Sequence, residues 1–330
     1  MEPTLDILYA FDEKYAPFAG VSLFSLLEAN REVEGLRVVL ALDGVSEESH
    51  RRFEETARSF GRELVFAEAN TLLPRIEATG VAAYRGSLAA NARLFWPDLL
   101  PNAAQRVLYL DCDTLVCGSL APLASVDLAG KTAGAVRDAL TGRYKSLLDF
   151  SASEPYFNSG VLLIDTTRWR ERQVSERIAA HAVTVRADYP FPDQDLINLV
   201  LRGNIAVLPP AYNFQPQHRV FSDKTYFSAY PREGYYEAWE LEDARRAPVI
   251  LHDYRMIGDY PWNKGKIHPD AALWENIRAR TPWRDDEPKP ARHGLTVAVE
   301  RVLYRLLPKG AFLRLFAREH DKNTRKRYRK

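Results

Sequence analysis

Short apolar runs alternate with segments of helical periodicity over the first 120 residues of the chain. The runs have the length and the β-branched and aromatic content of buried strands, whereas the segments between them repeat apolar residues every three or four positions. This alternation predicts an α/β protein whose βα units form a Rossmann-like, mostly parallel sheet flanked by helices. The expected strands are 5–11, 36–42, 63–67 and 106–110, and the expected helices are 18–30, 46–60 and 87–100.

The pattern is less regular after residue 120. Residues 209–250 are rich in Tyr, Pro and Arg with weak periodicity, so we expect loops there. Charged and Pro-containing sequence from residue 283 indicates a boundary between a catalytic body, 1–282, and a basic amphipathic C-terminal tail, 283–330. The further expected strands are 131–137, 157–165, 205–208 and 248–251, and the further expected helices are 167–185 and 193–201.

The charge of the chain is unevenly distributed. The net charge is +1, but residues 301–330 hold eleven Lys and Arg against two acidic residues, which is +9 and leaves −8 on the other 300 residues. Leu, Val and Phe are interleaved with the basic residues of 294–330, as in helices that lie on an anionic membrane surface. A helix packed on the body with a disordered basic end is the alternative. Nucleic-acid binding is not expected, because no binding motif accompanies the charge.

Targeting features and cysteine content favour a cytoplasmic protein. The N-terminus lacks the basic and apolar regions of a signal peptide, and no apolar run approaches the roughly 18 residues that a membrane span needs. Cys112 and Cys117 are too few for a disulfide scaffold, which favours a reducing compartment. We therefore expect a cytoplasmic body that associates peripherally with the inner face of the membrane through 294–330.

Asp111 and Asp113 come directly after the predicted strand 106–110. Side chains two positions apart on an extended chain point to the same side, so the two carboxylates repel each other unless a cation offsets their charge. Ligands of open α/β sheets bind beyond the carboxyl ends of the strands. The pair is therefore a candidate metal site for a phosphate-bearing ligand, although a solvated turn after a strand is an alternative.

Three other polar clusters lie at the ends of apolar or helical segments: 158–160 (Asn-Ser-Gly), 193–195 (Asp-Gln-Asp) and His252. Each also has a structural interpretation, as a turn, as a helix N-terminus that favours acids, or as an ordinary histidine. Two carboxylates and His252 as ligands suit Mn²⁺ better than Mg²⁺, which prefers oxygen ligands and keeps its waters.

The ordered set of these segments resembles glycosyltransferase family 8, and within it bacterial lipopolysaccharide galactosyl- and glucosyltransferases. The resemblance covers about residues 5–262. It implies a GT-A fold, a UDP-sugar donor, a saccharide or glycolipid acceptor, Mn²⁺ (or Mg²⁺ in its place) and retention of anomeric configuration. The landmarks are Tyr9-Ala10-Phe11-Asp12, Asn91-Ala92-Arg93-Leu94-Phe95, Leu110-Asp111-Cys112-Asp113, 157–164, 193–195, Tyr212-Asn213-Phe214, and His252 before Pro261-Trp262.

The resemblance also implies roles for individual residues. Asp111, Asp113 and His252 would be the metal ligands, with Asp111 also orienting the ribose. Ala10 and Asp12 would line the uracil pocket. Further contacts with the donor would come from Arg93, Cys112, Asp138, Asn158, Ser159, Asp193 and Gln194. Cys112 also fits a small buried apolar residue.

Retention of configuration leaves two chemical routes open. Double displacement needs a protein nucleophile on the far face of the sugar, whereas front-face transfer needs none, because the leaving phosphate takes the acceptor's proton. Asp193 and Gln194 are the candidate catalytic residues. Gln194 is a poor nucleophile because its amide is neutral, so we favour the front-face route. Asp195 is expected to be structural.

Two positions depart from the family pattern. Tyr260 stands where the family has a Lys that contacts the diphosphate, and Lys14 stands where an Asn often contacts the nucleotide. Arg255, Lys264 and Lys266 are the candidates to supply the missing charge. A non-catalytic nucleotide-sugar-binding protein is therefore an alternative function.

A phosphatase is the weaker alternative. Residues 111–116 (Asp-Cys-Asp-Thr-Leu-Val) also resemble the motif of haloacid-dehalogenase-like phosphatases, in which Asp111 would be the phosphoryl nucleophile. That motif normally opens its fold, whereas three predicted βα units precede it here.

Overall fold

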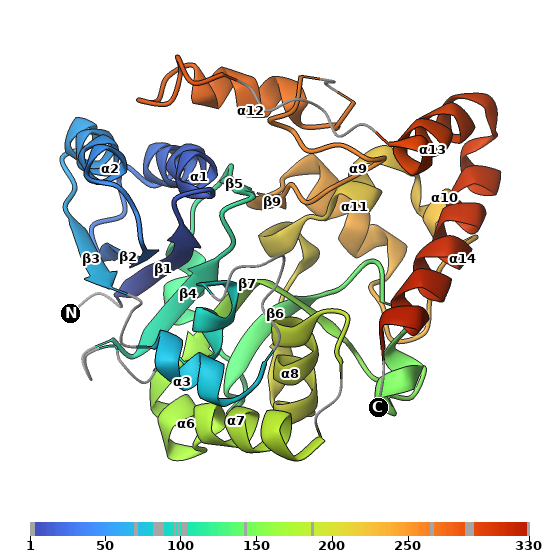
Figure 1. The fold of residues 1–330 in the computed structure, drawn as a ribbon, viewed down its shortest axis with the longest axis horizontal. Helices are drawn as coiled ribbons and strands as arrows, with labels where there is room; N and C mark the ends of the chain where they lie inside the picture. Colours follow the sequence, from blue (N-terminus) through green and yellow to red (C-terminus); the bar gives the residue numbers. More distant parts are fainter. Residues whose placement is uncertain are drawn as a thin grey trace.

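A seven-stranded mixed sheet forms the centre of the protein (Figure 1). The computed structural model describes residues 4–68, 72–81, 89–95, 97, 100, 104–141, 144–185, 188–264, 267–287 and 294–328. The strands of the sheet are β1 (Leu5–Asp12), β2 (Leu36–Asp43), β3 (Leu64–Glu68), β4 (Arg106–Leu110), β6 (Ala133–Arg137), β7 (Phe157–Asp165) and β8 (Ile205–Val207). Their order is β3-β2-β1-β4-β7-β6-β8; β7 runs antiparallel to both neighbours, and the other pairs are parallel.

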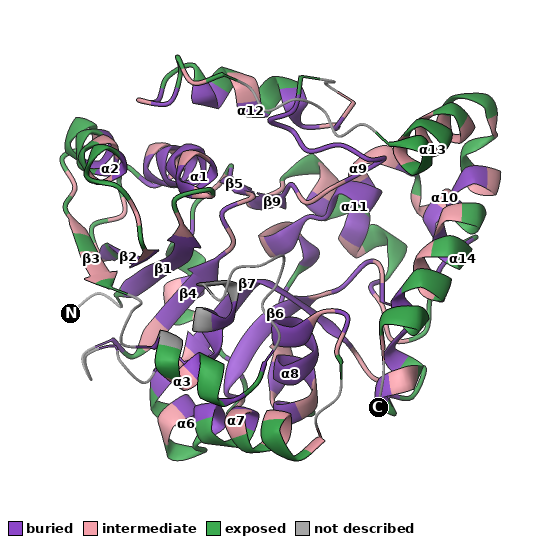
Figure 2. Ribbon diagram, viewed as in Figure 1, coloured by how far each residue is buried: buried purple, intermediate pink, exposed green. Residues whose placement is uncertain are grey.

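Helices cover both faces of the sheet because its strands carry apolar side chains on both sides (Figure 2). Ile7 and Tyr9 of β1 belong to the core on one face, and Leu8 and Ala10 belong to the core on the other. Helices α1 (Ala16–Ala29) and α2 (Glu47–Ser59) contribute to the first core. The second receives α3 (Leu73–Ala78), α6 (Thr166–Glu171), α7 (Val174–Val185) and α8 (Pro192–Val200).

A second, two-stranded sheet lies beside the first and joins distant parts of the chain. Strand β5 (Thr114–Val116) follows the Asp111/Asp113 pair and runs antiparallel to β9 (Ile250–His252). In this register Thr114 lies opposite His252. The pairing therefore brings the imidazole to the carboxylate pair, although the paired residues Thr114 and His252 are 138 positions apart in sequence. The sequence pattern did not predict β5.

The prediction of loops over 209–250 is wrong for about half of the segment, which is helical. Each helix is short, so a period of 3.6 residues has no room to repeat. Local hydrogen bonds define the helix starts: the Ser222 hydroxyl accepts from the Thr225 N–H, and the Glu237 N–H donates to the Glu240 carboxylate. The helices are η4 (Pro210–Asn213), α9 (Pro216–Val220), α10 (Asp223–Tyr226) and α11 (Ala238–Arg246).

Two predicted helices are also altered. The described part of 87–100 contains the 3₁₀ helix η2 (Ala89–Leu94), while residues 87, 88, 96, 98 and 99 lie outside the described residues. The expected helix 167–185 is divided into α6 and α7 at Gln173, whose φ of 49° cannot continue a right-handed helix. The remaining short elements are α5 (Ala121–Ser125) and η3 (Tyr144–Leu148).

The C-terminal region packs on the body. Trp283, just beyond the expected boundary, is 1% exposed, and it lies so close to α1 that a Cβ on Gly20 would be 2.1 Å from its ring. Three helices belong to this region: α12 (Ala271–Arg278), α13 (Leu295–Leu306) and α14 (Lys309–Arg327). Phe312 and Leu313 of α14 are buried against α9 and α10 residues. Among the described helices, none combines the length and apolar character needed to cross a bilayer.

Candidate active site

A cavity of about 730 Å³ lies at the carboxyl ends of β1, β4 and β6 and the beginning of β7. Strand ends are where ligands bind in open α/β sheets. All residues to which the sequence assigned a donor, metal or catalytic role line this cavity. They are Ala10, Asp12, Arg93, Asp111, Cys112, Asp113, Asp138, Asn158, Ser159, Asp193, Gln194 and His252.

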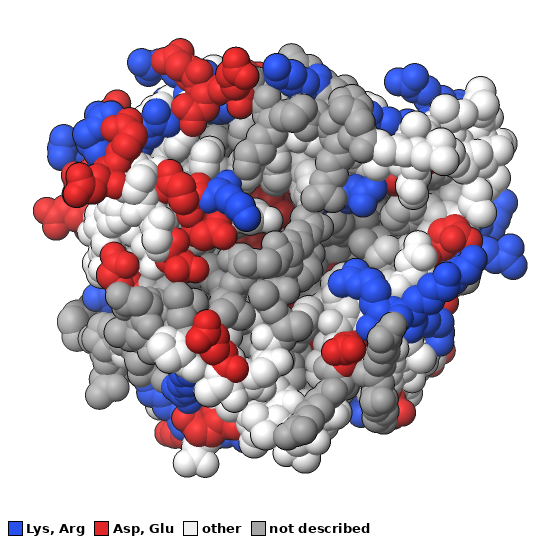
Figure 3. Space-filling view, viewed as in Figure 1, with Lys and Arg blue, Asp and Glu red and all other residues white. Residues whose placement is uncertain are grey.

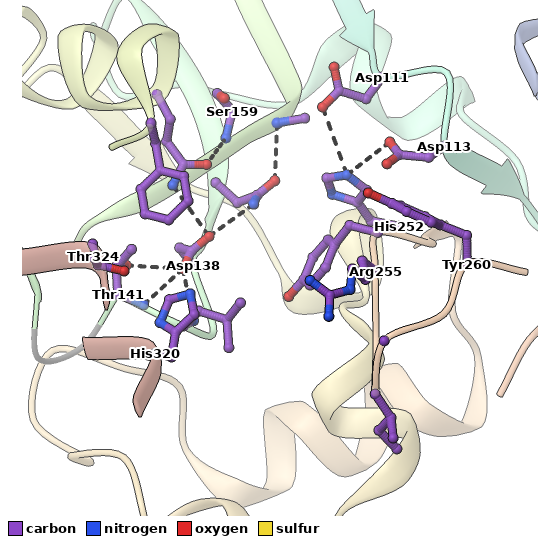
Figure 4. A pocket seen from close by; sticks show the side chains of 18 of the residues that line it. Asp111, Asp113, Asp138, Thr141, Ser159, His252, Arg255, Tyr260, His320 and Thr324 are labelled. Carbon is purple, nitrogen blue, oxygen red and sulfur yellow. Dashed lines mark hydrogen bonds and ion pairs between the residues drawn. The ribbon is translucent and has the colours of Figure 1, made fainter. Parts of the chain in front are cut away.

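Asp111, Asp113 and His252 converge at one point of the cavity wall (Figure 4). The Nε2 atom of His252 is 3.2 Å from Asp113 Oδ1 and 3.8 Å from Asp111 Oδ2. The ligand atoms of all three side chains lie within 4.8 Å of one another. Two carboxylates and an imidazole are a donor set that suits Mn²⁺, so the residues present fit the divalent cation that the sequence predicts.

The hydrogen bonds of His252 leave Nε2 facing the carboxylates. Asn213 Nδ2 donates to Asn158 Oδ1 at 2.9 Å, so its Oδ1 is the atom that meets His252 Nδ1, at 3.0 Å. Since that oxygen only accepts, Nδ1 carries the proton in neutral His252 and Nε2 keeps its lone pair. This orientation by a second residue is typical of metal-binding histidines.

The charge at this point favours a cation. Burial lowers the pKa of His252, but the nearby carboxylates of Asp113 and Asp111 outweigh burial and raise the pKa above its usual value. The same negative potential would stabilise a bound divalent ion.

Arg93 links Asp111 to the opposite wall of the cavity. Its buried guanidinium is 2.7 Å from Asp111 Oδ1 and 3.2 Å from Asp193 Oδ2, and it donates to the Ser159 carbonyl at 3.1 Å. Burial alone lowers the pKa of Arg93, but Asp111 and then Tyr109 and Asp193 raise it, so the charge is retained. Contact of Arg93 with the donor stays a prediction, whereas pairing with an acid, the other interpretation of an arginine in this position, is observed with two residues of the site.

Asp138 is held by hydrogen bonds to both of its carboxylate oxygens. Its Oδ1 accepts from the Leu140 N–H (2.8 Å), the Thr141 N–H (2.9 Å) and the Thr141 hydroxyl (3.0 Å). Its Oδ2 accepts from Asn158 Nδ2 at 2.9 Å and from Gln194 Nε2 at 3.4 Å. A continuous chain of hydrogen bonds therefore runs from Asp138 through Asn158 and Asn213 to His252.

The 193–195 cluster divides between cavity and core. Asp193 accepts from the Ser159 hydroxyl at 3.1 Å, and Gln194 Oε1 accepts from the Ser159 N–H at 3.1 Å, so both side chains are fixed at the cavity wall. Asp195 points into the core, where the hydroxyls of Tyr144 and Tyr156 donate to it. Burial raises the pKa of Asp195 to about 7. This placement agrees with the structural role expected for Asp195.

One end of the cavity contains the residues that the sequence predicts around uracil. Asp12 Oδ1 is buried and has no hydrogen-bond partner among the described residues, so an acceptor atom is available beside Ala10. Cys112 is also buried at the wall. Tyr260, in place of the expected Lys, stacks on Trp262 with ring centroids 4.7 Å apart.

Of the candidates to replace that Lys, Arg255 lines the cavity, where it pairs with Glu300 at 3.2 Å. Lys264 is exposed and does not line it, and Lys266 lies outside the described residues. Of the two candidates that the structure describes, Arg255 is therefore the one that reaches the site.

The C-terminal helices close one side of the cavity, which the sequence did not predict. His320 and Thr324 of α14 lie on the side of Asp138 and Thr141 in Figure 4. Arg327 is 5.7 Å from the ring centroid of Phe191, the residue that precedes α8. The wall contributed by α13 and α14 consists of Thr296, Val299, Glu300, Leu303, Phe312, Leu315, Phe316, Glu319, His320, Asn323, Thr324 and Arg327.

Fold and sequence comparisons define the class of the protein. The chain belongs to the family described as Glycosyl transferase family 8, which matches residues 6–264. Its α/β architecture is the GT-A fold: it superposes on a structure of the galactosyltransferase LgtC with donor and acceptor sugar analogs, with a TM-score of 0.67, 24% identity, and coverage of 89% of this chain and 99% of LgtC. WbbM, a bifunctional glycosyltransferase, gives a TM-score of 0.70 at 20% identity, covering 86% of this chain and 51% of that one.

Two curated relatives extend over most of the chain. General stress protein A of Bacillus subtilis (strain 168) is 29% identical over 288 residues, covering 84% of this chain and 94% of the relative. A lipopolysaccharide 1,2-glucosyltransferase of Escherichia coli (strain K12) is 26% identical over 292 residues, covering 87% of this chain and 81% of the relative. Membership of the family indicates that this protein transfers a glycosyl group.

Proposed function

We propose that the protein is a metal-dependent, retaining hexosyltransferase. It moves galactose or glucose from a UDP-sugar to a saccharide or glycolipid acceptor, in the assembly of bacterial envelope polysaccharide or lipopolysaccharide. The observation that carries the proposal is the convergence of Asp111, Asp113 and His252 at the wall of a cavity that also holds the expected donor-binding residues. The similarity to a lipopolysaccharide 1,2-glucosyltransferase supports the acceptor class.

The metal cluster would act on the leaving group. A bound divalent cation, Mn²⁺ by preference, supplies Lewis-acid neutralisation of the diphosphate charge that develops as the glycosidic bond breaks. Asp113 and His252 would hold such an ion, and Asp111 is restrained by the 2.9 Å hydrogen bond from Tyr109 and by Arg93. A site whose ligands are held in place needs little rearrangement during the reaction, which favours the transition state.

The opposite wall would orient the sugar. Asp138, Asn158 and Gln194 form one hydrogen-bonded group. Each side chain is therefore held in a fixed direction and offers its remaining hydrogen-bonding capacity to the cavity. The Gln194 amide is neutral and its oxygen already accepts from Ser159, which makes it a poor nucleophile. Asp193 is engaged by Arg93 and Ser159. These contacts support the front-face route, in which the leaving phosphate accepts the proton of the acceptor hydroxyl.

We also propose that residues 294–330 attach the protein to the cytoplasmic face of an anionic membrane. Helix α13 exposes apolar side chains, with Leu295 84% and Leu306 76% exposed. Lys and Arg side chains gather over α14 in Figure 3; the exposed ones are Lys309, Arg314, Arg318, Lys322, Arg325, Lys326 and Arg327. An apolar face beside a basic one is the pattern of interfacial helices. The division into a catalytic body, 1–282, and this tail remains a prediction.

One assay separates the proposal from a non-catalytic sugar-nucleotide binder, the alternative that the Tyr260 departure favours. The purified full chain is incubated with UDP-galactose, UDP-glucose and UDP-N-acetylglucosamine, with and without Mn²⁺, and released UDP is measured. We expect Mn²⁺-dependent release from one of the two hexose donors, and loss of that release in Asp113→Asn. UDP binding without release from any donor, even with a saccharide acceptor panel, would support the binder instead.

A further inference from the structure

A second group of potential metal ligands lies behind the cavity and takes no part in the proposed reaction. It consists of Asp253, which follows β9, His268 in the next loop, and Asp270 at the start of α12. All three are buried, with exposures of 1%, 3% and 1%. Their ligand atoms lie within 4.8 Å of one another, and none of the three lines the cavity.

Asp253 carries the strongest indication of a ligand. Neither of its carboxylate oxygens has a hydrogen-bond partner among the described residues, although the side chain is almost completely buried. An ionised carboxylate in that position is strongly destabilising unless a cation or a proton neutralises it. Burial, then the charge of the neighbouring Asp270 carboxylate and, in the protonated form, a hydrogen bond with it, raise the pKa of Asp253 well above its usual range, so a proton shared with Asp270 is the competing solution.

The tautomer of His268 suits metal binding. Its Nδ1 accepts from the Asp270 N–H at 3.2 Å, which assigns the ring proton to Nε2, and Nε2 lies 3.2 Å from the Tyr254 carbonyl. A neutral imidazole that donates its Nε2 proton to a backbone carbonyl is oriented as metal-binding histidines are, and an ion bound at Nδ1 would replace the hydrogen bond from the Asp270 N–H. Burial lowers the pKa of His268, which keeps the ring neutral.

Distance and charge agree with this interpretation. His268 Nδ1 is 4.0 Å from Asp270 Oδ2, and ligands of one tetrahedral ion with bonds of about 2.1 Å lie roughly 3.4 Å apart, so a small contraction suffices. Arg219 pairs with Asp270 Oδ1, the oxygen on the other side of that carboxylate. One guanidinium against two carboxylates leaves a negative charge on the described part of the cluster.

We propose that Asp253, His268 and Asp270 form a second, structural site for a divalent transition-metal cation of the Zn²⁺ or Mn²⁺ class. Nitrogen and carboxylate ligands together favour these ions over Mg²⁺ and Ca²⁺. The Asp253 N–H donates to the Asp113 carbonyl at 2.6 Å, so the ion would anchor the loop that carries Asp113 to the start of α12. The proposal is independent of the sugar donor and of the acceptor.

The test uses the full chain with Asp111→Asn and Asp113→Asn, which removes the carboxylates of the cavity cluster. This protein is dialysed against Zn²⁺ or Mn²⁺ and then against metal-free buffer, and its metal content is measured by mass spectrometry. We expect about one retained ion per chain, because a closed buried site releases its ion slowly. Adding His268→Gln, which keeps an N–H for Tyr254 but lacks the Nδ1 ligand, should reduce the content to near zero.

Asp253→Asn distinguishes a cation from a proton. Asn resembles the protonated acid, so if a proton neutralises Asp253, the Asp253→Asn variant should have unchanged thermal stability and its parent protein should retain no metal. That result would overturn the proposal. A bound ion predicts that Asp253→Asn loses both the metal and the rise in melting temperature that the metal produces. Asp259→Asn is the matched control, because Asp259 is equally buried but is bonded by Asn263 and Ile267. If the double-Asn parent is unstable, the same comparison in the wild-type chain should show one ion fewer for His268→Gln than for Asp259→Asn.

Discussion

The backbone of Gly160 lies directly against the imidazole of His252. A Cβ at position 160 would be 2.2 Å from His252 Cε1 and 2.7 Å from Asp111 Oδ2. Real Cβ contacts are never so short, so any side chain there must displace the two proposed metal ligands. Glycine is required at this strand position by the close approach of a functional side chain, since its backbone conformation is that of an ordinary strand.

Gly160→Ala should therefore disable the metal site. We expect Mn²⁺ affinity to fall at least about tenfold, equivalent to about 1.4 kcal/mol, because ligand geometry is lost while the ligands remain. Calorimetric titration of Mn²⁺ in the presence of UDP measures this change. Gly118→Ala is the control, since the nearest atom to a Cβ there is 3.4 Å away, an ordinary contact. Equal affinity in the two variants would contradict the arrangement described here.

Asn213→Ala should weaken the same site without touching a ligand. The variant removes the acceptor that holds the His252 Nδ1 proton, so the ring is free to turn its other nitrogen toward the carboxylates. Loss of such an orienting partner typically costs about 10- to 100-fold in metal affinity or activity. Mn²⁺-dependent UDP release measures the effect. Asn263→Ala is the control. It also removes a buried amide, but one that donates to Asp259 and not to the site, so the Mn²⁺ dependence should be unchanged.

Asp195 should make stability depend on pH. Its folded-state pKa is raised to about 7, whereas in the unfolded chain it is about 4. Between these values the folded state holds a proton that the unfolded state has released, so the stabilisation present below pH 4 is lost as pH rises through 7, with a slope of up to about 1.4 kcal/mol per pH unit. Asp195→Asn should flatten the pH profile of the free energy of unfolding, measured with urea from pH 4.5 to 7.5. Parallel profiles would show that Asp195 does not carry the dependence.

The basic surface of α14 should govern membrane association. Lys322→Glu with Lys326→Glu should lower the binding constant for phosphatidylglycerol vesicles, measured by sedimentation, on the order of 30-fold or more. Each basic residue near an anionic surface contributes about 1 kcal/mol, and two of them are lost. Arg51→Glu with Arg58→Glu on α2 is the charge-matched control, as both arginines are exposed on a helix outside the tail. Equal losses for the two pairs would indicate a general effect of net charge.

Periodicity was sufficient to predict the sheet because most of its strands are buried apolar runs. The expected strands 5–11, 36–42, 106–110 and 157–165 each agree with an observed strand to within one residue at either end. The helices of 209–250 were missed because four to nine residues cannot display a period and because capping by Ser222 and Glu237 is local chemistry. Apolar composition also could not reveal β5, a three-residue strand whose partner lies more than 130 positions away.

The site residues were predicted from the family's motifs, and the structure brings all of them to one cavity. The residues that orient these side chains, or leave space for them, were not predicted from the sequence. Asn213 belongs to one of the family's landmarks but had no predicted role, and Gly160 was predicted only as part of the 158–160 cluster. The α14 wall was missed for a different reason: its alternation of basic and apolar residues fits a membrane surface and a packed helix equally well, and only tertiary contacts show that Phe312 and Leu313 are buried.

The most direct test of the central claim is the affinity of UDP with and without Mn²⁺, measured by calorimetry on the wild-type chain and on Asp113→Asn. If Asp111, Asp113 and His252 hold the ion that binds the diphosphate, UDP should bind the wild-type chain at least about tenfold more tightly with Mn²⁺, a coupling of about 1.4 kcal/mol, and Asp113→Asn should abolish the difference. UDP affinity that is the same with and without Mn²⁺, or an Mn²⁺ effect that survives in Asp113→Asn, would contradict it.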